Sequence, residues 1–303
     1  ALFCRATMNQ PLLAVSSWSW HAPYYAGQWS LLDLPRDAAA LGLRAIEAND
    51  FILPPPPLSR LRRPLLDLLP GAPPELWRYS RTTLEQLRRQ AAENGTELLG
   101  WTINSDFTVP AWQWPAQRLY LARGLDAARR LGVRLLRVNL GGSPQTPAAR
   151  DDRVVARLAA FVQQSQAGNG GPAITLENHW GISSDIDRHL RIFDRVRARL
   201  AEPVQAQFGC CFDPSNMDAG EGEEATGRRE RWWQALAERA NHFHLKTTTF
   251  DAQGRETTLP HEQLWALLQS VGYEGAVTIE FQGEGEPAAG VARSIDLFHT
   301  LAR

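Results

Sequence analysis

Four side chains in the last third of the chain have the chemistry of metal ligands and recur at similar intervals. Glu177, Asp213, His244 and Glu280 each end a short apolar run, and the intervals between them are close to one βαβ unit, roughly 30 residues or more. The same kind of residue at the same place in successive units predicts one shared site. Three carboxylates and one imidazole suit a divalent cation and leave coordination positions for substrate oxygens.

An alternative interpretation gives each of these residues a structural role, in which it caps a helix or pairs with a nearby arginine. For any one residue alone, that interpretation is the stronger. For all four in phase we favour a metal site. Converging carboxylates without a cation would repel one another, and burying unpaired charge is costly.

Short apolar runs bounded by Gly, Pro and polar residues predict eight strands that alternate with helices. The strands are expected at residues 12–20, 43–49, 97–103, 133–140, 174–177, 208–213, 242–246 and 276–281. The four-proline run at 54–57 predicts an elaborated loop with a short helix at its middle, because proline fits neither a helix interior nor a central strand.

This alternation predicts a parallel sheet, and eight such units favour closure into a (β/α)8 TIM barrel. No glycine-rich phosphate fingerprint follows the first strand, which weakens the dinucleotide-binding alternative. The chain has 303 residues, 44% of them hydrophobic, and no composition break marks a linker. We therefore expect a single (β/α)8 barrel domain over residues 1–303, with residues 1–10 as a disordered arm or a cloning remnant.

Charge and apolar patterning exclude several classes of function. The net charge is −1 and the pI about 6.7, so no excess of positive charge favours nucleic acid or an anionic membrane. No run reaches the ~20 apolar residues of a membrane span, and no signal pattern opens the sequence. Cys210 and Cys211 adjoin in an expected buried strand, so we interpret them as free core thiols. We expect a cytoplasmic protein that binds a small molecule, and leave a homo-oligomer open.

The active sites of such barrels form at the carboxyl ends of the strands, so polar residues there are further candidates. They are Trp20, His21, Glu47, Asn49, Asn104, Asp106, Arg137, Asn139, His179, Asn216 and Lys246. Aromatic residues at such positions often line ligand pockets, although core packing is equally expected for any one of them. The tryptophans concerned are Trp18, Trp20, Trp101, Trp112, Trp114 and Trp180.

Four short motifs accompany the last four expected strands in order. They are Leu176-Glu177-Asn178-His179, Cys211-Phe212-Asp213-Pro214-Ser215-Asn216, His242-Phe243-His244-Leu245-Lys246 and Thr278-Ile279-Glu280. Together with segment 41–47, they resemble the sugar phosphate isomerase/epimerase superfamily of xylose isomerase-like barrels, which is related to ketose 3-epimerases and to apurinic endonuclease type 2. The resemblance covers nearly the whole chain.

The resemblance implies one divalent metal ion (Mn, Mg, Co or Zn), bound by the four residues named first, and no organic cofactor. It also implies that Glu177 and Glu280 act as acid and base on opposite faces of a sugar, while the metal stabilises an enediolate. Substrate contacts are implied for His179, Asn216 and Lys246. The strand-end positions add further candidates for substrate binding, which are Arg137, Trp20, Glu47 and Asn104.

Two positions depart from the family pattern. Thr247 follows the His-x-His-x-Lys stretch where relatives often have Asp, and Asn216 stands where ketose epimerases have His. The second departure argues against 3-epimerisation of a free ketose. His242 and His244 point to the same side of a strand. The resemblance places the ligand at His244 and leaves His242 as a packing or supporting group.

The leading hypothesis is a divalent-metal-dependent isomerase or epimerase of a sugar or polyol, active in carbohydrate metabolism, with manganese among the expected metals. The nearest alternative is a lyase on the same scaffold: a keto-inositol or dehydroshikimate dehydratase, or a keto-glycoside-cleaving enzyme. An apurinic endonuclease is remote, since it needs more ligands and a basic face. A non-catalytic sugar-binding barrel would not need an intact ligand set. Aromatic loops at 20–27, 50–57 and 107–114 favour an unphosphorylated sugar or glycoside, although Arg137 could hold a phosphate.

Overall fold

Eight parallel strands close into a barrel in the computed structural model, which describes residues 11–55, 69–167 and 170–303. Each strand pairs with the next, and β8 closes on β1 where Leu13 lies beside Val277. The predicted (β/α)8 barrel is therefore confirmed. The strands are β1 (Leu13–Ser16), β2 (Ala45–Asn49), β3 (Glu97–Thr102), β4 (Leu135–Val138), β5 (Ala173–Glu177), β6 (Phe208–Phe212), β7 (Ala240–Thr247) and β8 (Ala276–Phe281).

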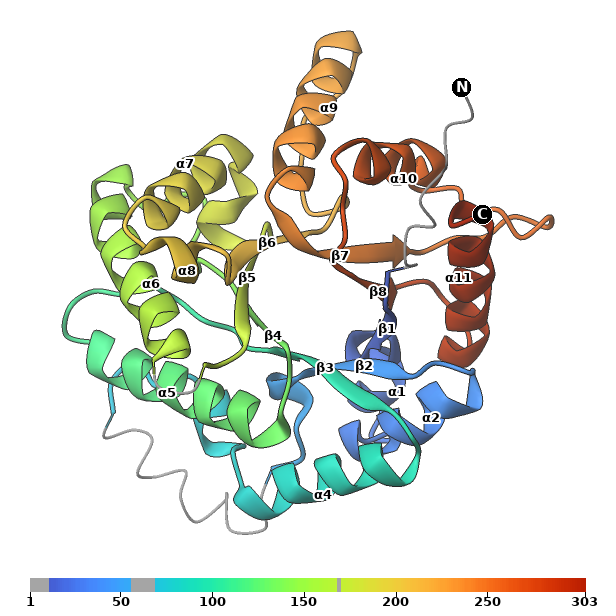
Figure 1. Cartoon of the computed structure of the whole chain (residues 1–303), viewed down its shortest axis with the longest axis horizontal. Coiled ribbons are helices and arrows are strands. Elements are labelled where there is room, and N and C mark those ends of the chain that lie inside the picture. Colours follow the sequence, from blue (N-terminus) through green and yellow to red (C-terminus); the bar gives the residue numbers. More distant parts are fainter. Residues whose placement is uncertain (1–10, 56–68, 168–169) are drawn as a thin grey trace.

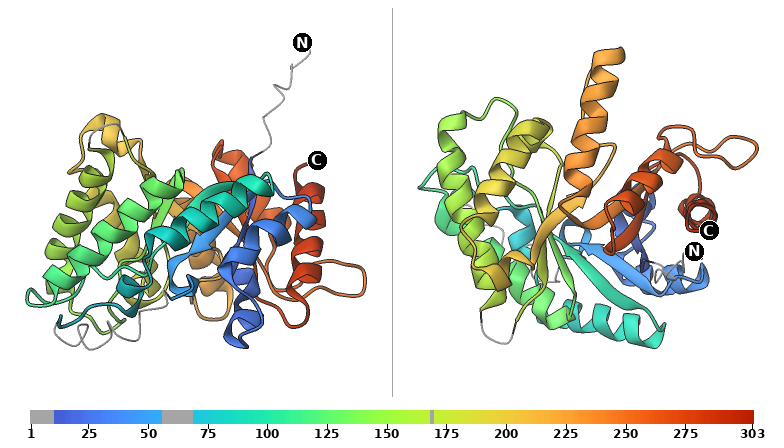
Figure 2. Two further views of the ribbon diagram at one scale, coloured as in Figure 1. Left: turned by 90° about the horizontal axis from the view of Figure 1, so that it is seen from below. Right: turned by 45° about the horizontal axis from the view of Figure 1, so that its top comes forward.

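Helices surround the strands as an outer layer (Figure 1), and two further views show the same arrangement from other sides (Figure 2). The α-helices are α1 (His21–Tyr25), α2 (Leu34–Ala40), α4 (Arg81–Glu93), α5 (Trp114–Leu131), α6 (Asp151–Gln166), α7 (Ile186–Arg197), α8 (Glu202–Gln205), α9 (Glu223–Ala237), α10 (His261–Ser270) and α11 (Pro287–Leu301). Short 3-10 helices are η1 (Ser17–Trp20), η2 (Leu31–Asp33), η3 (Asp50–Ile52), η4 (Pro74–Trp77), η5 (Ala148–Arg150) and η6 (Gly181–Ser184). In the described part of the chain, none of the helices has the length and apolar character needed to cross a membrane.

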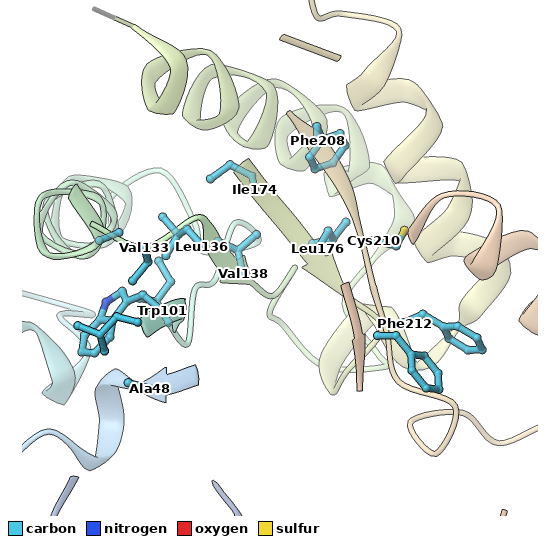
Figure 3. Packing of buried hydrophobic residues seen from close by; sticks show 14 of the residues in the cluster. Ala48, Trp101, Val133, Leu136, Val138, Ile174, Leu176, Phe208, Cys210 and Phe212 are labelled. Carbon is cyan, nitrogen blue, oxygen red and sulfur yellow. The ribbon is translucent and has the colours of Figure 1, made fainter. Parts of the chain in front are cut away.

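The larger part of the core lies between the strands and the helices. Outward-facing strand side chains such as Leu136, Ile174, Leu176 and Phe208 are buried there (Figure 3). Full burial of such a side chain contributes about 1.5–3 kcal/mol. A second, smaller cluster fills the barrel at the amino ends of the strands and consists of Ala14, Ala45, Leu99 and Leu135. Apolar side chains therefore fill the barrel at the amino ends of the strands, and the polar interior side chains lie toward the carboxyl ends.

Two sequence-based expectations need comment. The first strand was predicted to reach Trp20, but it ends at Ser16 and η1 follows. The Ser16 hydroxyl accepts a hydrogen bond from the backbone N–H of Trp18 at 3.3 Å, and such local bonds compete with a strand ladder. Cys210 and Cys211 are buried free thiols, as predicted. The expectations for residues 1–10 and for a short helix within the proline-rich loop fall largely on residues outside the described part.

Candidate active site

Strand alternation directs polar side chains into the barrel, and β7 shows this most clearly. His242, His244 and Lys246 alternate with Phe243 and Leu245, and all five are buried. Because successive side chains on a strand point to opposite faces, the three polar residues face the barrel interior. Phe243 and Leu245 belong to the core beneath the helices. The spacing of β7 thus stacks three polar groups toward the carboxyl end of the barrel.

The four predicted metal ligands converge around one nitrogen of His244. The Nδ1 atom of His244 lies 3.5 Å from Glu177 Oε1, 3.8 Å from Asp213 Oδ2 and 2.9 Å from Glu280 Oε2. All four side chains are buried, with Glu280 the most exposed at 7%. The structure therefore brings together residues from four successive strands or strand ends, as their phase predicted.

The spacing of these atoms fits a divalent cation. Ligand atoms about 2.0–2.2 Å from a metal lie roughly 3–3.5 Å from one another. Glu177, Asp213 and His244 form a group whose potential ligand atoms lie within 4.8 Å of one another, and Glu280 lies beside His244 Nδ1 at 2.9 Å. Asp213 Oδ2 and His244 Nδ1 have no hydrogen-bond partner among the described residues, whereas Glu177 Oε2 forms an ion pair with Arg137. Unpartnered buried oxygen and nitrogen atoms are unusual in a folded protein. Asp213 and His244 thus have atoms available as metal ligands.

Formal charges also fit one divalent cation. The buried carboxylates of Glu47 and of the three acidic ligands carry four negative charges. Arg137 forms an ion pair with one of them, and Lys246 lies within 3.3 Å of two others. These two cations offset half of the negative charge. Burial acts to lower the pKa of His244, but the surrounding acids raise it well above its usual value, and a bound metal would displace that proton. With His244 then neutral, two negative charges remain, which one divalent cation would balance.

Hydrogen bonds fix Asp213 in the orientation that a ligand needs. The amide of Asn178 donates to the backbone carbonyl of Asp213 at 2.7 Å and accepts from its backbone N–H at 3.0 Å. Ser215 donates to Asp213 Oδ1 through its backbone N–H at 2.8 Å and through its hydroxyl at 2.6 Å. Oδ1 is thereby occupied, and Oδ2 faces the shared centre. Asn216 similarly donates to Glu177 Oε1 at 3.1 Å.

Electrostatics keep the acids ionised and the flanking imidazoles neutral. Burial acts to raise the pKa of Asp213 and of Glu280, but the nearby ammonium of Lys246 and the ring of His244 hold both well below their usual values. Burial, together with the positive charge of Arg137, lowers the pKa of His179 to about 3. The two carboxylates can therefore accept a proton, and His179 can act as a neutral hydrogen-bonding group.

A cavity of about 510 Å³ opens above this cluster and contains most of the predicted substrate-binding residues. The predicted residues that line it, two of them also metal-ligand candidates, are Glu47, Asn49, Asn104, Arg137, His179, Asn216, His244, Lys246 and Glu280. Trp20 is not among the lining residues, because it is buried and stacks on Trp29 with ring centroids 5.8 Å apart. The cavity gives the predicted substrate role of Trp20 no support, and Trp18 lines it instead.

Other strand-end candidates have local roles. His21 stacks on Trp18 with ring centroids 4.7 Å apart. Asp106 accepts hydrogen bonds from the backbone N–H and the hydroxyl of Thr108. The amide of Asn139 lies 3.5 Å from the side-chain oxygen of Asn104, at the edge of the cavity. These residues shape the loops around the site.

Sequence reasoning missed several residues that line the cavity. They are Ser16, Glu75, Arg78, Thr102 and Gln282, whereas Tyr24, Tyr25 and Phe51 belong to the aromatic loops at 20–27 and 50–57 that the sequence analysis named. Arg78 donates to the hydroxyl of Tyr24 at 3.2 Å and to the carbonyl of Leu53 at 2.8 Å, which anchors the segment after η4 over the first loop. Glu75 and Arg78 had no strand-end signal, because they belong to the long connection between β2 and β3. Of the tryptophans, Trp18 and Trp180 line the cavity, whereas Trp101 is buried in the core.

A protein-family model described as Xylose isomerase-like TIM barrel matches residues 35–301. The chain belongs to this family. The family resemblance inferred from the four motifs is therefore confirmed. A comparison with curated protein sequences finds no match.

Solved structures with the same fold cover nearly the whole chain of this xylose isomerase-like barrel. D-allulose 3-epimerase from Methylomonas sp. gives a TM-score of 0.67 at 14% identity, over 98% of this chain and 100% of that one. A Xylose isomerase-like TIM barrel protein from Mycobacterium smegmatis in complex with magnesium gives 0.64 at 14% identity, over 97% of each chain. A probable 3-DHS dehydratase from Bacillus anthracis gives 0.62 at 12% identity, over 96% of this chain and 98% of that one. At these identities the likeness shows a shared fold.

Proposed function

We propose that this xylose isomerase-like barrel is a divalent-metal-dependent isomerase or epimerase that moves a proton next to a carbonyl of a sugar or polyol. One observation carries the proposal. Glu177 and Glu280 come from strands separated by β6 and β7, yet both lie within 3.5 Å of His244 Nδ1 below the cavity. Two carboxylates on different sides of one cation site are suited to accept and return protons from different directions.

The metal site would be formed by Glu177, Asp213, His244 and Glu280, which fit a divalent cation in spacing and charge. A cation bound there would supply positive charge to a substrate carbonyl oxygen and so make the adjacent C–H acidic. This is the chemistry for which a small, buried, oxygen-rich donor set is suited. The structures of similar fold include a complex with magnesium, which supports a metal in this family without identifying it here.

The two carboxylates divide the proton transfer between them. The nearby Lys246 holds Glu280 ionised, so Glu280 can take a proton from the carbon next to the carbonyl. Glu177 can then return a proton to the opposite face, which inverts that carbon and gives epimerisation. If one carboxylate instead carries the proton between neighbouring carbons, the result is isomerisation. Asn216, which donates to Glu177 Oε1, steadies the second carboxylate.

Three cavity residues are placed to hold substrate oxygens. Lys246 contacts Asp213 and Glu280 and, as an ammonium with three donors, retains one N–H for a substrate oxygen. Arg137 Nε and His179 Nδ1 have no hydrogen-bond partner among the described residues. Both residues line the cavity. Donors of this kind stabilise negative charge that develops on an oxygen during proton abstraction.

The outer part of the cavity favours a neutral sugar or glycoside. Trp18 meets Phe51 and Tyr25 edge-on, with ring centroids 5.5 and 6.3 Å apart. Tyr25 and Trp180 line the same cavity and are 68% and 41% exposed. Aromatic faces pack well against the C–H faces of a sugar ring. Each cation among the described lining residues already contacts a protein acceptor, which disfavours a phosphate.

Elimination is the second candidate reaction. The same proton abstraction leads to loss of water or of an aglycone when a leaving group occupies the next carbon. A probable dehydratase shares the fold, which keeps this outcome within the range of the scaffold. The mass of the product separates the two reactions: an unchanged mass means isomerisation or epimerisation, and loss of water or aglycone means elimination.

The test combines metal analysis with substitution of the two carboxylates. We expect one divalent metal ion per chain, and deuterium incorporation next to the carbonyl when a panel of keto-sugars and keto-glycosides turns over in D₂O. Glu177→Gln and Glu280→Gln should each lower kcat by about 10²–10⁴-fold, because each removes a group that transfers a proton. Glu97→Gln, at the amino end of β3, serves as the control and should leave kcat unchanged.

Two results would overturn the proposal. The first is a protein that turns over these substrates at the same rate after complete metal removal. The second is wild-type turnover in both Gln variants.

A further inference from the structure

Glu47 lies inside the barrel on the side of His244 that faces away from the other acids. Its carboxylate is 1% exposed. Oε1 lies 3.5 Å from His244 Nε2, and Oε2 lies 3.3 Å from His242 Nε2. The other nitrogen of His244, Nδ1, faces Glu177, Asp213 and Glu280. The two nitrogens of one imidazole therefore face two different acidic environments.

We propose that Glu47 is a positioning residue that holds His244 in the tautomer with its proton on Nε2, so that Nδ1 presents a lone pair to the metal. This inference rests on the metal site of the proposed function. A metal-binding imidazole commonly donates its other N–H to a carboxylate, which fixes the tautomer and the ring orientation. At 3.5 Å the Glu47 contact is longer than a hydrogen bond, and we expect it to shorten to one when a metal binds Nδ1.

The neighbouring strand is built to accommodate this carboxylate. The register between β2 and β3 shifts between Ile46 and Glu47, so that Glu47 pairs with Gly100. A Cβ atom at position 100 would lie 3.1 Å from Glu47 Cγ and 3.3 Å from Oε2. Bulges of this kind commonly redirect a side chain next to a site. Here the shift places Gly100, the one glycine of β3, opposite Glu47.

A hydrogen bond with the neighbouring strand β8 holds His242 beside Glu47. His242 Nε2 lies 2.8 Å from the hydroxyl of Thr278 and also faces Glu47 Oε2. His242 is fully buried. It lies beside one carboxylate oxygen of Glu47, and the other oxygen faces His244. This position fits the supporting role expected for His242.

The alternative for Glu47 is the direct substrate contact predicted from its strand-end position, since it also lines the cavity. The two roles differ in what they affect. A substrate contact changes KM and leaves the metal in place. A positioning role changes metal affinity and the ligand field of the metal, whether or not substrate is present.

The test measures cobalt binding to Glu47→Ala, Glu47→Gln and Gly100→Ala. Dissociation constants come from competition with a chelator, and the visible absorption of bound Co²⁺ reports the ligand field. Glu47→Ala should weaken binding by about 10–100-fold and alter the spectrum. Glu47→Gln keeps an acceptor for Nε2–H and should weaken binding less. Gly100→Ala should produce a smaller loss, because it displaces the carboxylate without removing it.

Asp50→Asn is the matched control, because Asp50 is a buried acid just after β2 that contacts tyrosines rather than His244. It should bind cobalt as the wild type does. Wild-type protein that binds no cobalt would refute the metal of the proposed function itself. If the wild type binds and Glu47→Ala shows the same affinity and spectrum, only this inference is overturned. If Glu47→Ala does not fold, unchanged cobalt binding in both Glu47→Gln and Gly100→Ala overturns it equally.

Discussion

Buried acids at the carboxyl end of the barrel are neutralised in two different ways. In the candidate metal-site cluster, which consists of Glu177, Asp213, His244 and Glu280, Arg137 and Lys246 contact the carboxylates directly. In the second group, Asp50 is fully buried, and its Oδ2 accepts hydrogen bonds from the hydroxyls of Tyr79 at 2.6 Å and Tyr120 at 2.5 Å. One group is balanced by charge and the other by neutral donors.

The pKa shifts follow this difference. Burial raises the pKa of Asp50 to about 7, and the hydrogen bonds from the two tyrosines only partly offset the effect. Burial acts on Glu280 in the same direction, but Lys246 and His244 outweigh it and lower its pKa. Neutral donors therefore form hydrogen bonds with a buried carboxylate but stabilise its negative charge less strongly than a cation does. A site that must keep several acids ionised needs cations, and the metal-site cluster has them.

The Asp50 group also has a place in the architecture of the site. The hydroxyl of Tyr120, on α5, accepts a hydrogen bond from the backbone N–H of Asn104 at 3.0 Å. Asp50 thereby connects the segment after β2 to the loop after β3. Asn104 lines the cavity, whereas Asp50 does not. We infer a structural role for this acid, in contrast to the chemical role proposed for the acids on β5 to β8.

We expect the largest effect on activity from removing the positive charge of Lys246. Lys246→Met keeps the length of the side chain but removes a cation that contacts Asp213 and Glu280. We expect turnover to fall by about 10²–10³-fold, because a donor to developing negative charge is lost. Metal affinity should stay equal or increase, because a competing positive charge has gone. Metal content by elemental analysis, measured beside kcat, checks this result.

Lys246→Arg is the control for charge, and it should retain metal and recover part of the activity. Loss of the metal in Lys246→Met would show that the ammonium supports the ligands rather than the substrate. The cluster would then depend on Lys246 for its structure, and its proposed difference from the Asp50 group would no longer hold.

The sequence predicted that Glu177, Asp213, His244 and Glu280 would lie close together, because a barrel converts periodic spacing into proximity. Parallel strands end at one rim, so polar residues that recur once per unit must meet there. Glu177, Asp213, His244 and Glu280 needed no knowledge of loop structure. The inner cluster of Ala14 and Ala45 and the outer core follow from the same strand alternation.

The Asp50 group could not be predicted in this way. Its tyrosines lie 29 and 70 residues away in sequence, one after η4 and one on α5. Neither position is fixed by the strand period. The same holds for Glu75 and Arg78 at the cavity mouth, which depend on the path of a long connection. Glu47 was found from its strand, but the register shift that places it opposite Gly100 has no signal in the sequence.

Asp50→Asn should change how stability depends on pH. The pKa of Asp50 is about 7 in the folded protein and 3.8 as the reference value, so the unfolded chain gives up its proton first. Wild-type stability should therefore fall as pH rises from about 4 to about 7, by up to roughly 1.4 kcal/mol per pH unit from this group. An asparagine does not titrate. Relative to wild type, Asp50→Asn should thus gain stability as pH rises from about 4 to about 7.

Urea unfolding of both proteins across that pH range measures the effect. Tyr79→Phe is a suitable companion variant, because it removes one donor and keeps the acid, and the pH dependence should persist in it. A constant difference between wild type and Asp50→Asn at every pH would mean that Asp50 is ionised throughout. Its group would then resemble the metal-site cluster after all.

Glu256 is an acid whose pKa is shifted in the direction opposite to that of Asp50, and we expect it to have a smaller effect on stability. Burial acts to raise its pKa, but His261, Thr258 and backbone N–H groups of the same loop lower it to about 2 from 4.5. The N–H groups of Thr248, Thr258 and Leu259 donate to it at 2.8–3.1 Å. A lowered pKa contributes stability above about pH 4.5, and that contribution is lost as pH falls toward 2.

Glu256→Gln should therefore be less stable than wild type near neutral pH, and the difference should shrink between about pH 6 and about pH 3. Thermal midpoints across this range measure it. Glu97→Gln, an exposed acid at the far end of the barrel, should show little such trend. If the difference in stability between Glu256→Gln and wild type stayed constant down to pH 3, the N–H donors would form hydrogen bonds with Glu256 without stabilising its charge, as the tyrosine hydroxyls do with Asp50. Backbone N–H groups would then stabilise a buried carboxylate no better than the tyrosine hydroxyls do. Only side-chain cations or a metal would keep a buried acid of this barrel ionised.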